Sequence, residues 1–257
     1  MSRFRSRVML ASAAMAVAAL AYVGPAHGIA NGEDVPDGMY QFSAALSMPK
    51  VTRPDGTTYA TACSGALIAP QWIVSAGHCF HDGARNRVSG PPRYQVIVTV
   101  GQATLSGDDG QRTEVVEVVQ QPDTDLAVAK LAEPITGVEP LALADAAPAE
   151  GDVVRLVGWG SADGSADLSH RPDRMQTGLM KVEKVAAHEI YFTGYQPQSD
   201  TSACPYDSGA PYFVESEDGP RLVGTEVDGP SCPHDKKEEA ARVDAIADWI
   251  RGHTGSA

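Results

Sequence analysis

The sequence has 257 residues with 33 acidic and 20 basic side chains, and its formal net charge at pH 7 is −13. This acidity argues against a nucleic acid or an anionic membrane surface as a partner. A chain of this length can bury a full hydrophobic core, either as one large β-unit or as two lobes.

The first 28 residues have the pattern of an export signal. Three arginines lie among the first seven residues, and an apolar run follows from Val8 to Val23. That run is about 16 residues long, short of the roughly 20 that a membrane span needs, so a cleaved signal is favoured over a membrane anchor. Small residues precede a cut after Gly28. We therefore expect a soluble, secreted, extracellular chain that starts at Ile29 and has no membrane contact in its mature form.

Short segments rich in β-branched residues alternate with turns rich in Gly, Asp and Pro. We expect strands at residues 41–48, 65–69, 72–77, 94–101, 113–120, 125–131, 152–160, 178–185, 188–194, 210–215 and 221–227. Their number and spacing predict an all-β barrel or sandwich. Residues 132–151, rich in Pro, Ala and Gly, are the best candidate linker between two halves. Apolar residues at helical spacing predict one helix at 243–253.

Three motifs supply the residue types of nucleophilic catalysis. "WIVSAGHC" puts His78 at the end of an apolar strand, "DTDLAVAKL" puts Asp125 at the start of another, and "CPYDSGAP" supplies Ser208. A serine hydroxyl attacks only when a base takes its proton, and an acid must orient that base. Each residue alone could be a turn, a cap or a satisfied surface histidine. Asp123 lies close by, but the apolar strand that follows favours Asp125.

An α/β-hydrolase site of the same residue types does not fit. It needs the pattern GxSxG and the order Ser, Asp, His. Here Tyr206 and Ala210 stand where both glycines would be, and the order is His, Asp, Ser.

These motifs together resemble the chymotrypsin/trypsin family of secreted serine endopeptidases, and we expect a bacterial member. The resemblance covers nearly all of residues 29–251. It includes "IANG" where the family has a mature N-terminus like IVGG, then "CSGALIAPQWIVSAGHC", "DLAVAKL", "VGWG", the serine loop and the terminal helix. It implies an all-β fold of two antiparallel Greek-key β-barrels packed together with a C-terminal α-helix. The first barrel would occupy residues 29–135 and the second residues 136–257.

The resemblance also implies the roles of the three residues. His78 and Asp125 of the first barrel would act as general base and orienting acid, and Ser208 of the second would form an acyl-enzyme. The backbone N–H groups of Tyr206 and Ser208 would bind the oxyanion. The substrate would be a polypeptide, and a protein inhibitor is a further expected partner. We expect a monomer and no cofactor.

Four cysteines in an exported chain allow three disulfide pairings. A metal site is not favoured, because neither CxxC nor HExxH occurs. The acidic turn "SGDDGQR" could hold calcium, although such turns are usually solvated. The family resemblance implies that Cys63 pairs with Cys79 and Cys204 with Cys232.

The N-terminus is expected to act as a switch. The resemblance implies that a freed α-amino group at Ile29 inserts and pairs with Asp207, so that signal cleavage itself would create the active form. A buried ion pair of this kind is costly to break. The alternative is that Asp207 only caps a turn and Ile29 only packs.

The serine loop departs from the family pattern. The family usually has GDSGGP, and this chain has "YDSGAP". Glycine tolerates backbone angles that a bulky residue tolerates poorly, so Tyr206 is expected to distort the oxyanion site or crowd the cleft. A binding protein with a protease fold, or a weakly active homologue, is therefore the alternative function.

The specificity pocket is also unusual. Counting back from the serine loop places Ser202 at its base, and an uncharged base favours an apolar or aromatic side chain. Three residues stand where the family commonly has Ser-Trp-Gly: Val227, Asp228 and Gly229. Glu238 or Glu239, which replace a wall that usually contains glycine, could instead attract a basic side chain, as could Asp228. The preference stays open at this point.

Overall fold

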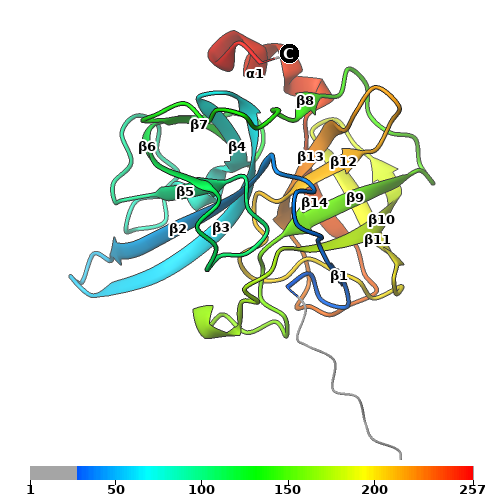
Figure 1. Ribbon diagram of the computed structural model, residues 1–257, viewed down its shortest axis with the longest axis horizontal. Coiled ribbons are helices and arrows are strands. Elements are labelled where there is room, and N and C mark those ends of the chain that lie inside the picture. Colours follow the sequence, from blue (N-terminus) through cyan, green and yellow to red (C-terminus); the bar gives the residue numbers. More distant parts are fainter. Residues whose placement is uncertain (1–27, 257) are drawn as a thin grey trace, which may run out of the picture.

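The computed structural model describes residues 28–256 (Figure 1). The expected export signal therefore lies, apart from Gly28, outside the described residues. Within the described part, no helix has the length and hydropathy that a membrane span requires.

The described chain is built mainly from β-strands. In chain order they are β1 (Glu33–Asp34), β2 (Ser43–Thr52), β3 (Thr58–Ala69), β4 (Trp72–Ala76), β5 (Ile97–Val100), β6 (Gln111–Gln120), β7 (Leu126–Leu131), β8 (Ala142–Leu143), β9 (Val153–Gly158), β10 (Gln176–Val185), β11 (Glu189–Gln196), β12 (Pro211–Val214), β13 (Arg221–Asp228) and β14 (Glu238–Arg242). The helical elements are three 3₁₀ turns and one α-helix: η1 (Gly77–Cys79), η2 (Leu168–His170), η3 (Asp244–Ile246) and α1 (Ala247–Thr254).

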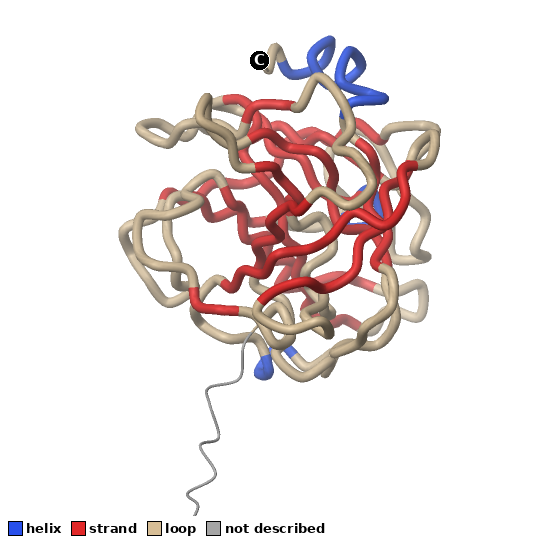
Figure 2. Tube along the Cα trace, turned by 90° about the vertical axis from the view of Figure 1, so that its right-hand side faces the viewer, coloured by secondary structure: helices blue, strands red, loops and turns tan. Residues whose placement is uncertain are grey.

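The strands form two closed antiparallel barrels, which confirms the predicted fold. The first barrel has the order β2-β3-β4-β7-β6-β5 and closes through the pairing of β2 with β5. The second has the order β10-β11-β14-β13-β12-β9 and closes through the pairing of β10 with β9. Closure pairs the strand edges within each barrel, while the outer part of the β2–β3 hairpin extends beyond the first barrel. The two barrels lie side by side, with α1 at one end (Figure 1), and Figure 2 shows the strands enclosed by loops.

An aromatic seam joins the two barrels. The ring of Phe42, which enters β2, meets the ring of Phe213 on β12 edge-on, with centroids 5.3 Å apart. Tyr40 packs against the same Phe213 ring at 5.2 Å. Both phenylalanines belong to one buried cluster with residues of both barrels. The barrels therefore share a core, and a domain boundary between residues 135 and 136 stays a prediction.

Three differences between the observed and the expected strands and helix have a clear physical reason. β3 starts at Thr58, several residues before the expected start, because it continues as a long hairpin with β2. β14 is a strand despite its "EEAAR" composition, since it is held between β11 and β13; pairing overrides local propensity there. The terminal helix starts with the 3₁₀ turn η3 and ends at Gly255, whose φ of 66° is the left-handed conformation that glycine tolerates.

Candidate active site

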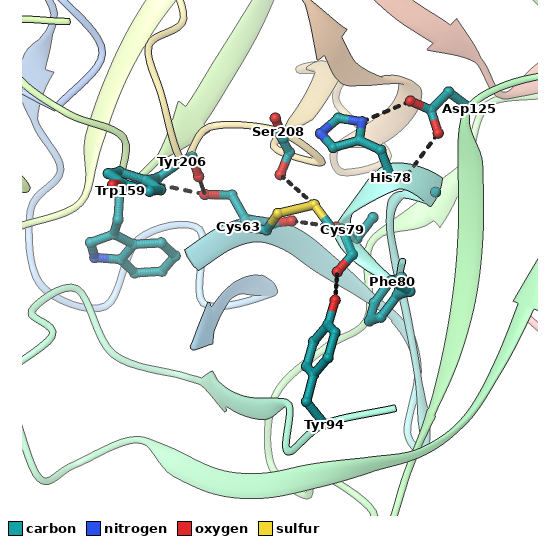
Figure 3. The surroundings of a disulfide bond; sticks show 12 residues. Cys63, His78, Cys79, Phe80, Tyr94, Asp125, Trp159, Tyr206 and Ser208 are labelled. Carbon is teal, nitrogen blue, oxygen red and sulfur yellow. Dashed lines mark hydrogen bonds and ion pairs between the residues drawn. A yellow bond between two sulfur atoms is a disulfide. The ribbon is translucent and has the colours of Figure 1, made fainter. Parts of the chain in front are cut away.

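His78 and Asp125 meet in a double hydrogen bond. His78 lies in η1, directly after β4, and Asp125 directly precedes β7. The His78 ring Nδ1 is 2.7 Å from Asp125 Oδ2, and the His78 backbone N–H donates to Asp125 Oδ1 at 2.8 Å (Figure 3). A Cβ on Gly77 would lie 2.7 Å from Asp125 Oδ1, so only glycine lets the two segments approach this closely. The geometry fixes both the place and the orientation of the imidazole.

Arg87 is a further partner of Asp125 that the sequence analysis missed. Its Nη1 donates to Asp125 Oδ1 at 3.0 Å and to the Thr124 carbonyl at 2.9 Å. Burial alone would raise the pKa of the Asp125 carboxyl, but hydrogen bonds and positive charge from His78 and Arg87 outweigh it, so its pKa lies below the ordinary value. Asp125 is therefore held as a carboxylate.

Ser208 sits in a turn that both barrels hold in place. Its carbonyl accepts the N–H of Ser64 on β3 at 2.9 Å, and the next residue, Gly209, donates to the Glu226 carbonyl on β13 at 2.7 Å. Gly209 has a φ of 84°. A Cβ there would lie 2.3 Å from the Ser64 carbonyl oxygen, so glycine is required.

The Ser208 turn faces the His78–Asp125 pair across one cavity. The cavity has a volume of about 710 Å³, and His78, Asp125, Tyr206 and Ser208 all line it. Figure 3 shows the Ser208 side chain beside the His78 ring. No hydrogen bond among the described residues joins the two side chains, and such contacts often tighten only when substrate is bound. The three residues that the sequence singled out are thus together.

Tyr206 adopts the left-handed backbone conformation of a glycine, with a φ of 82°. Its ring is directed toward the loop before β10. The phenol O–H donates to the Ala166 carbonyl, and the Arg171 guanidinium lies 5.6 Å from the ring centroid. The left-handed backbone conformation costs a bulky residue roughly 1–2 kcal/mol of conformational free energy. The ring contacts offset that strain, so the loop accommodates the tyrosine.

The peptide bond before Tyr206 has a defined direction. The Pro205 carbonyl accepts the N–H of Ser161 at 2.7 Å. This peptide is not among the cis bonds of the described chain. In a trans peptide the N–H points opposite to the C=O. The Tyr206 N–H therefore points away from Ser161.

Asp207 is a fully buried carboxyl in the serine turn. It accepts the Gly160 N–H at 2.8 Å and the Cys204 N–H at 3.0 Å. Burial raises its pKa to about 7, although these hydrogen bonds and the charge of Arg171 act in the opposite direction. A carboxyl so placed favours a nearby cation.

Ile29 is also fully buried, in the same cluster as Ala210 of the serine loop. The following residue, Ala30, pairs with Ser202 in an isolated antiparallel bridge. The segment is thus anchored inside the second barrel, near the chain that carries Ser208.

The two disulfides are those that the resemblance implied. Cys63 on β3 is bonded to Cys79 in η1, beside His78. Cys204, before the serine turn, is bonded to Cys232. Among the described residues, no group of three or more His, Cys, Asp or Glu side chains is arranged to hold a metal ion.

A second cavity of about 260 Å³ lies beside Ser208. Its lining includes four residues expected in the specificity pocket: Val227, Asp228, Gly229 and Glu238. Ser202, expected at its base, is not on its surface. The Ser202 side chain is fully buried, and its Oγ accepts the His234 N–H at 3.2 Å. Glu239 lines the larger cavity instead.

Glu226 is a lining residue that the sequence analysis did not single out. The sequence does mark this position, because Glu226 is a single glutamate that interrupts the otherwise apolar strand "RLVGTEV". Arg87 gave no such signal, since "RNRVSG" has the composition of an exposed turn.

Two barrels with a His–Asp pair and a serine turn at their junction define a serine-protease domain. Residues 29–250 match the family described as Trypsin, so the chain belongs to the trypsin family.

Curated relatives include coagulation factor XII of Sus scrofa, 28% identical over 229 residues. Coagulation factor XII of Bos taurus is 28% identical over 228 residues. Each match covers 76% of this chain and 36% of the relative, so the chain spans about a third of the length of these proteins. Both relatives are mammalian, and they give no support to the expected bacterial source.

The Arg87→Met variant should stay folded but lower the reactivity of Ser208. The substitution removes the guanidinium that donates a charged hydrogen bond to Asp125, and this loosens the His78–Asp125 pair. We expect the rate of Ser208 phosphonylation to fall roughly tenfold, as a charged hydrogen bond of about 1.5 kcal/mol implies. The measurement is the labelling rate with a fluorophosphonate, and the exposed Arg112→Met is the matched control. An unchanged rate in Arg87→Met would rule out a positioning role.

Proposed function

We propose that the protein is a secreted serine endopeptidase that hydrolyses peptide bonds through an acyl-enzyme on Ser208. The observation that carries the proposal is the His78–Asp125 hydrogen-bond pair, which faces the Ser208 turn across one cavity. Membership of the trypsin family and the two disulfides, which are typical of exported chains, support it.

The mechanism follows from the positions of the three side chains. His78 takes the Ser208 proton as Ser208 Oγ attacks the substrate carbonyl, and then gives that proton to the leaving amine. Asp125 accepts from Nδ1, which leaves Nε2 free to act as the base, and its carboxylate stabilises the imidazolium. Water then attacks the acyl-enzyme, with His78 again as the base.

The oxyanion would be bound by the backbone N–H groups of Tyr206 and Ser208. One such donor contributes roughly 2.7–4 kcal/mol to the transition state. The Ser161 hydrogen bond to the Pro205 carbonyl supports this arrangement, because it holds that carbonyl away from the side on which the Tyr206 N–H lies. The alternative function, a binding protein with a protease fold, was based on the expectation that Tyr206 distorts the serine loop. Tyr206 instead adopts the left-handed φ of a glycine, which weighs against this alternative.

We further propose that the α-amino group of Ile29 pairs with Asp207 once the chain is cut after Gly28. The support is that Asp207 is fully buried, with a raised pKa and two N–H donors, and that Ile29 is buried in the same barrel. An ammonium beside this carboxyl would supply the countercharge that burial demands.

Covalent labelling tests the proposed function. A fluorophosphonate should react with Ser208: the Oγ–P bond forms, fluoride leaves, and His78 takes the proton. We expect a mass increase of one adduct on the chain that starts at Ile29, and none in Ser208→Ala. The adjacent Ser64→Ala is not a suitable control, since Ser64 holds the turn, and the exposed Ser216→Ala serves instead. A folded chain that stays unlabelled would contradict the proposal.

The activation pair predicts a pH-dependent difference in stability between two forms of the chain. In a form extended upstream of Ile29, the pKa of Asp207 is about 7 against an ordinary 3.8. The stability contributed by its protonated form is complete below about pH 4 and is lost as the pH rises to about 7, at up to roughly 1.4 kcal/mol per pH unit. In the form that starts at Ile29, the ammonium favours the carboxylate, so this loss should shrink.

The measurement is the free energy of unfolding in urea for both forms between pH 4 and pH 8. Other buried carboxyls contribute equally to both forms and cancel in the difference. Asp207→Asn in the extended form should remove the excess pH dependence. Parallel pH profiles for the two forms would contradict the Ile29–Asp207 pair.

A further inference from the structure

The wall of the larger cavity carries opposite charges on its two barrels. Its lining residues include one arginine, Arg85, which lies in the loop after η1 of the first barrel. The second barrel contributes two acidic residues, Asp228 on β13 and Glu239 on β14. Asp125 also lines the cavity, but its charge is already paired with Arg87. A polypeptide that crosses the cavity therefore meets positive charge at the first barrel and negative charge at the second.

Arg85 belongs to a basic stretch of an otherwise acidic chain. Residues 48–95 contain five lysines and arginines against two aspartates, whereas the whole sequence has a net charge of −13. Both aspartates accept hydrogen bonds within their own turns, Asp55 in the β2–β3 hairpin and Asp82 in the loop of Arg85. This part of the surface therefore attracts an acidic group, while the rest of the molecule repels one.

Arg85 has no acidic partner within the described chain. The arginines that form ion pairs there are Arg87, Arg155, Arg174, Arg242 and Arg251. The guanidinium of Arg85 forms neither an ion pair nor a hydrogen bond with another described residue, and the side chain is exposed at the cavity wall. A guanidinium offers several N–H donors in a planar fork that matches a carboxylate. These donors are free to bind a ligand.

The turn that carries Arg85 is tightly closed. The Asp82 carboxylate accepts the N–H groups of Ala84 and Asn86, each at 2.9 Å, and the Arg85 N–H donates to the Asp82 carbonyl at 2.9 Å. Arg85 itself has a φ of 67°, a left-handed conformation that an arginine adopts only under constraint. Strain of this kind persists where the surrounding contacts fix it, and it clusters at ligand sites.

The same loop is anchored at its base and against the β2–β3 hairpin. His81 and Arg87 close the base in an isolated antiparallel bridge. A Cβ on Gly83 would lie 2.0 Å from the Thr52 carbonyl oxygen, so the loop packs directly on the end of β2. Arg85 therefore has a fixed place beside the cavity.

The free edge of β3 leads from the serine turn toward this loop. β3 pairs with β2 along the hairpin, but with β4 only from Ala66 onward. The Ser64 N–H donates to the Ser208 carbonyl, so it points away from β2. Backbone N–H groups two residues apart on a strand point the same way, so the Ala62 N–H also faces away from β2, and Ala62 lines the cavity.

The far end of this edge lies at the Arg85 loop. Thr58, the first residue of β3, pairs with Thr52, which the loop contacts. In Figure 1 the hairpin formed by β2 and β3 projects beyond the first barrel. An extended chain that leaves Ser208 along β3 therefore runs toward Arg85.

We propose that Arg85 binds an acidic side chain of the polypeptide substrate, within the first three residues after the cut bond. The inference rests on the proposed endopeptidase function. The smaller cavity, which would take the side chain before the cut bond, shares Ser208 with the larger one but has no residue of the hairpin or of the Arg85 loop on its wall. The segment after the cut bond is left to the first barrel, where Arg85 is the unpaired charge.

Acyl transfer tests this without knowledge of the side chain that precedes the cut bond. p-Nitrophenyl acetate acetylates Ser208: the bond from Oγ to the acetyl carbon forms, p-nitrophenolate leaves, and His78 takes the serine proton. A peptide amine then attacks the acetyl carbonyl, and the bond to Ser208 Oγ breaks. His78 carries the proton of the amine to that oxygen, which regenerates the serine.

Each reaction contains an equimolar pair of tripeptide amides that differ only in Glu against Gln at one position, with alanine at the other two. Three such pairs place the acid first, second or third. The terminal amide leaves the glutamate side chain as the only carboxylate of the peptide. Mass spectrometry gives the ratio of the two N-acetyl peptides, corrected for the background with Ser208→Ala.

At one or more positions the Glu peptide should be favoured about threefold to fivefold, which is the size of an exposed ion pair. The preference should shrink at high salt, because salt screens exposed charges.

Variants assign the preference to one side chain. Arg85→Gln should bring the product ratio to one, and Arg85→Lys should keep most of the preference. Arg93→Gln is the matched control, because Arg93 is exposed and lies in the same basic stretch but not on the cavity wall; it should leave the ratio unchanged. The rate of fluorophosphonate labelling should be equal in all three variants, which separates substrate preference from a fault in the fold.

A ratio near one at all three positions, or a preference that survives in Arg85→Gln, would overturn the inference and leave the proposed protease intact. Loss of the preference in Arg93→Gln as well would assign it to the general charge of the surface and not to Arg85. An acetyl-enzyme that yields only acetate would show that the first barrel does not bind the leaving peptide. A chain whose Ser208 takes neither fluorophosphonate nor acetyl would overturn the proposed function together with the inference, before any peptide is added.

Discussion

The buried carboxyl of Asp207 is the constraint on which the rest of the site depends. It lies next to Ser208 and binds the N–H groups of Gly160 and Cys204, so it ties the serine turn to the loop after β9 and to the disulfide. A Cβ on Gly160 would lie 2.0 Å from Asp207 Oδ2, so position 160 must be glycine. Such a group is stable only when neutral or paired, which makes the order of the serine turn sensitive to what lies beside it.

The two-barrel fold explains why the three candidate catalytic residues come from distant parts of the sequence. His78 and Asp125 belong to the first barrel, and Ser208 belongs to the second. The shared core and the aromatic seam around Phe213 fix the barrels against each other. The serine turn adds a direct link, through Ser64 on one barrel and the Glu226 carbonyl on the other. The proposed catalysis would need these positions to be held within about half an ångström.

Short motifs were enough to predict the fold and to single out His78, Asp125 and Ser208, because local spacing and strand context carry that information. The contacts between distant segments were not predictable. Arg87 reaches Asp125 from a turn with an ordinary composition. The single glutamate in an apolar strand did mark Glu226, but its place on the cavity wall depends on how distant segments pack. Tyr206 was expected to distort its loop on backbone preference alone. Its ring contacts with Ala166 and Arg171, which lie far away in the sequence, offset that preference. Ser202 was placed by counting, which cannot show which way a side chain faces.

A crystal structure of the chain that starts at Ile29, after reaction with a fluorophosphonate, tests the account most directly. We predict phosphorus bonded to Ser208 Oγ, a phosphonyl oxygen that accepts the N–H groups of Tyr206 and Ser208, and the Ile29 ammonium beside the Asp207 carboxylate. A Pro205 carbonyl turned into the oxyanion position, or an Ile29 ammonium in solvent with Asp207 still buried alone, would contradict it.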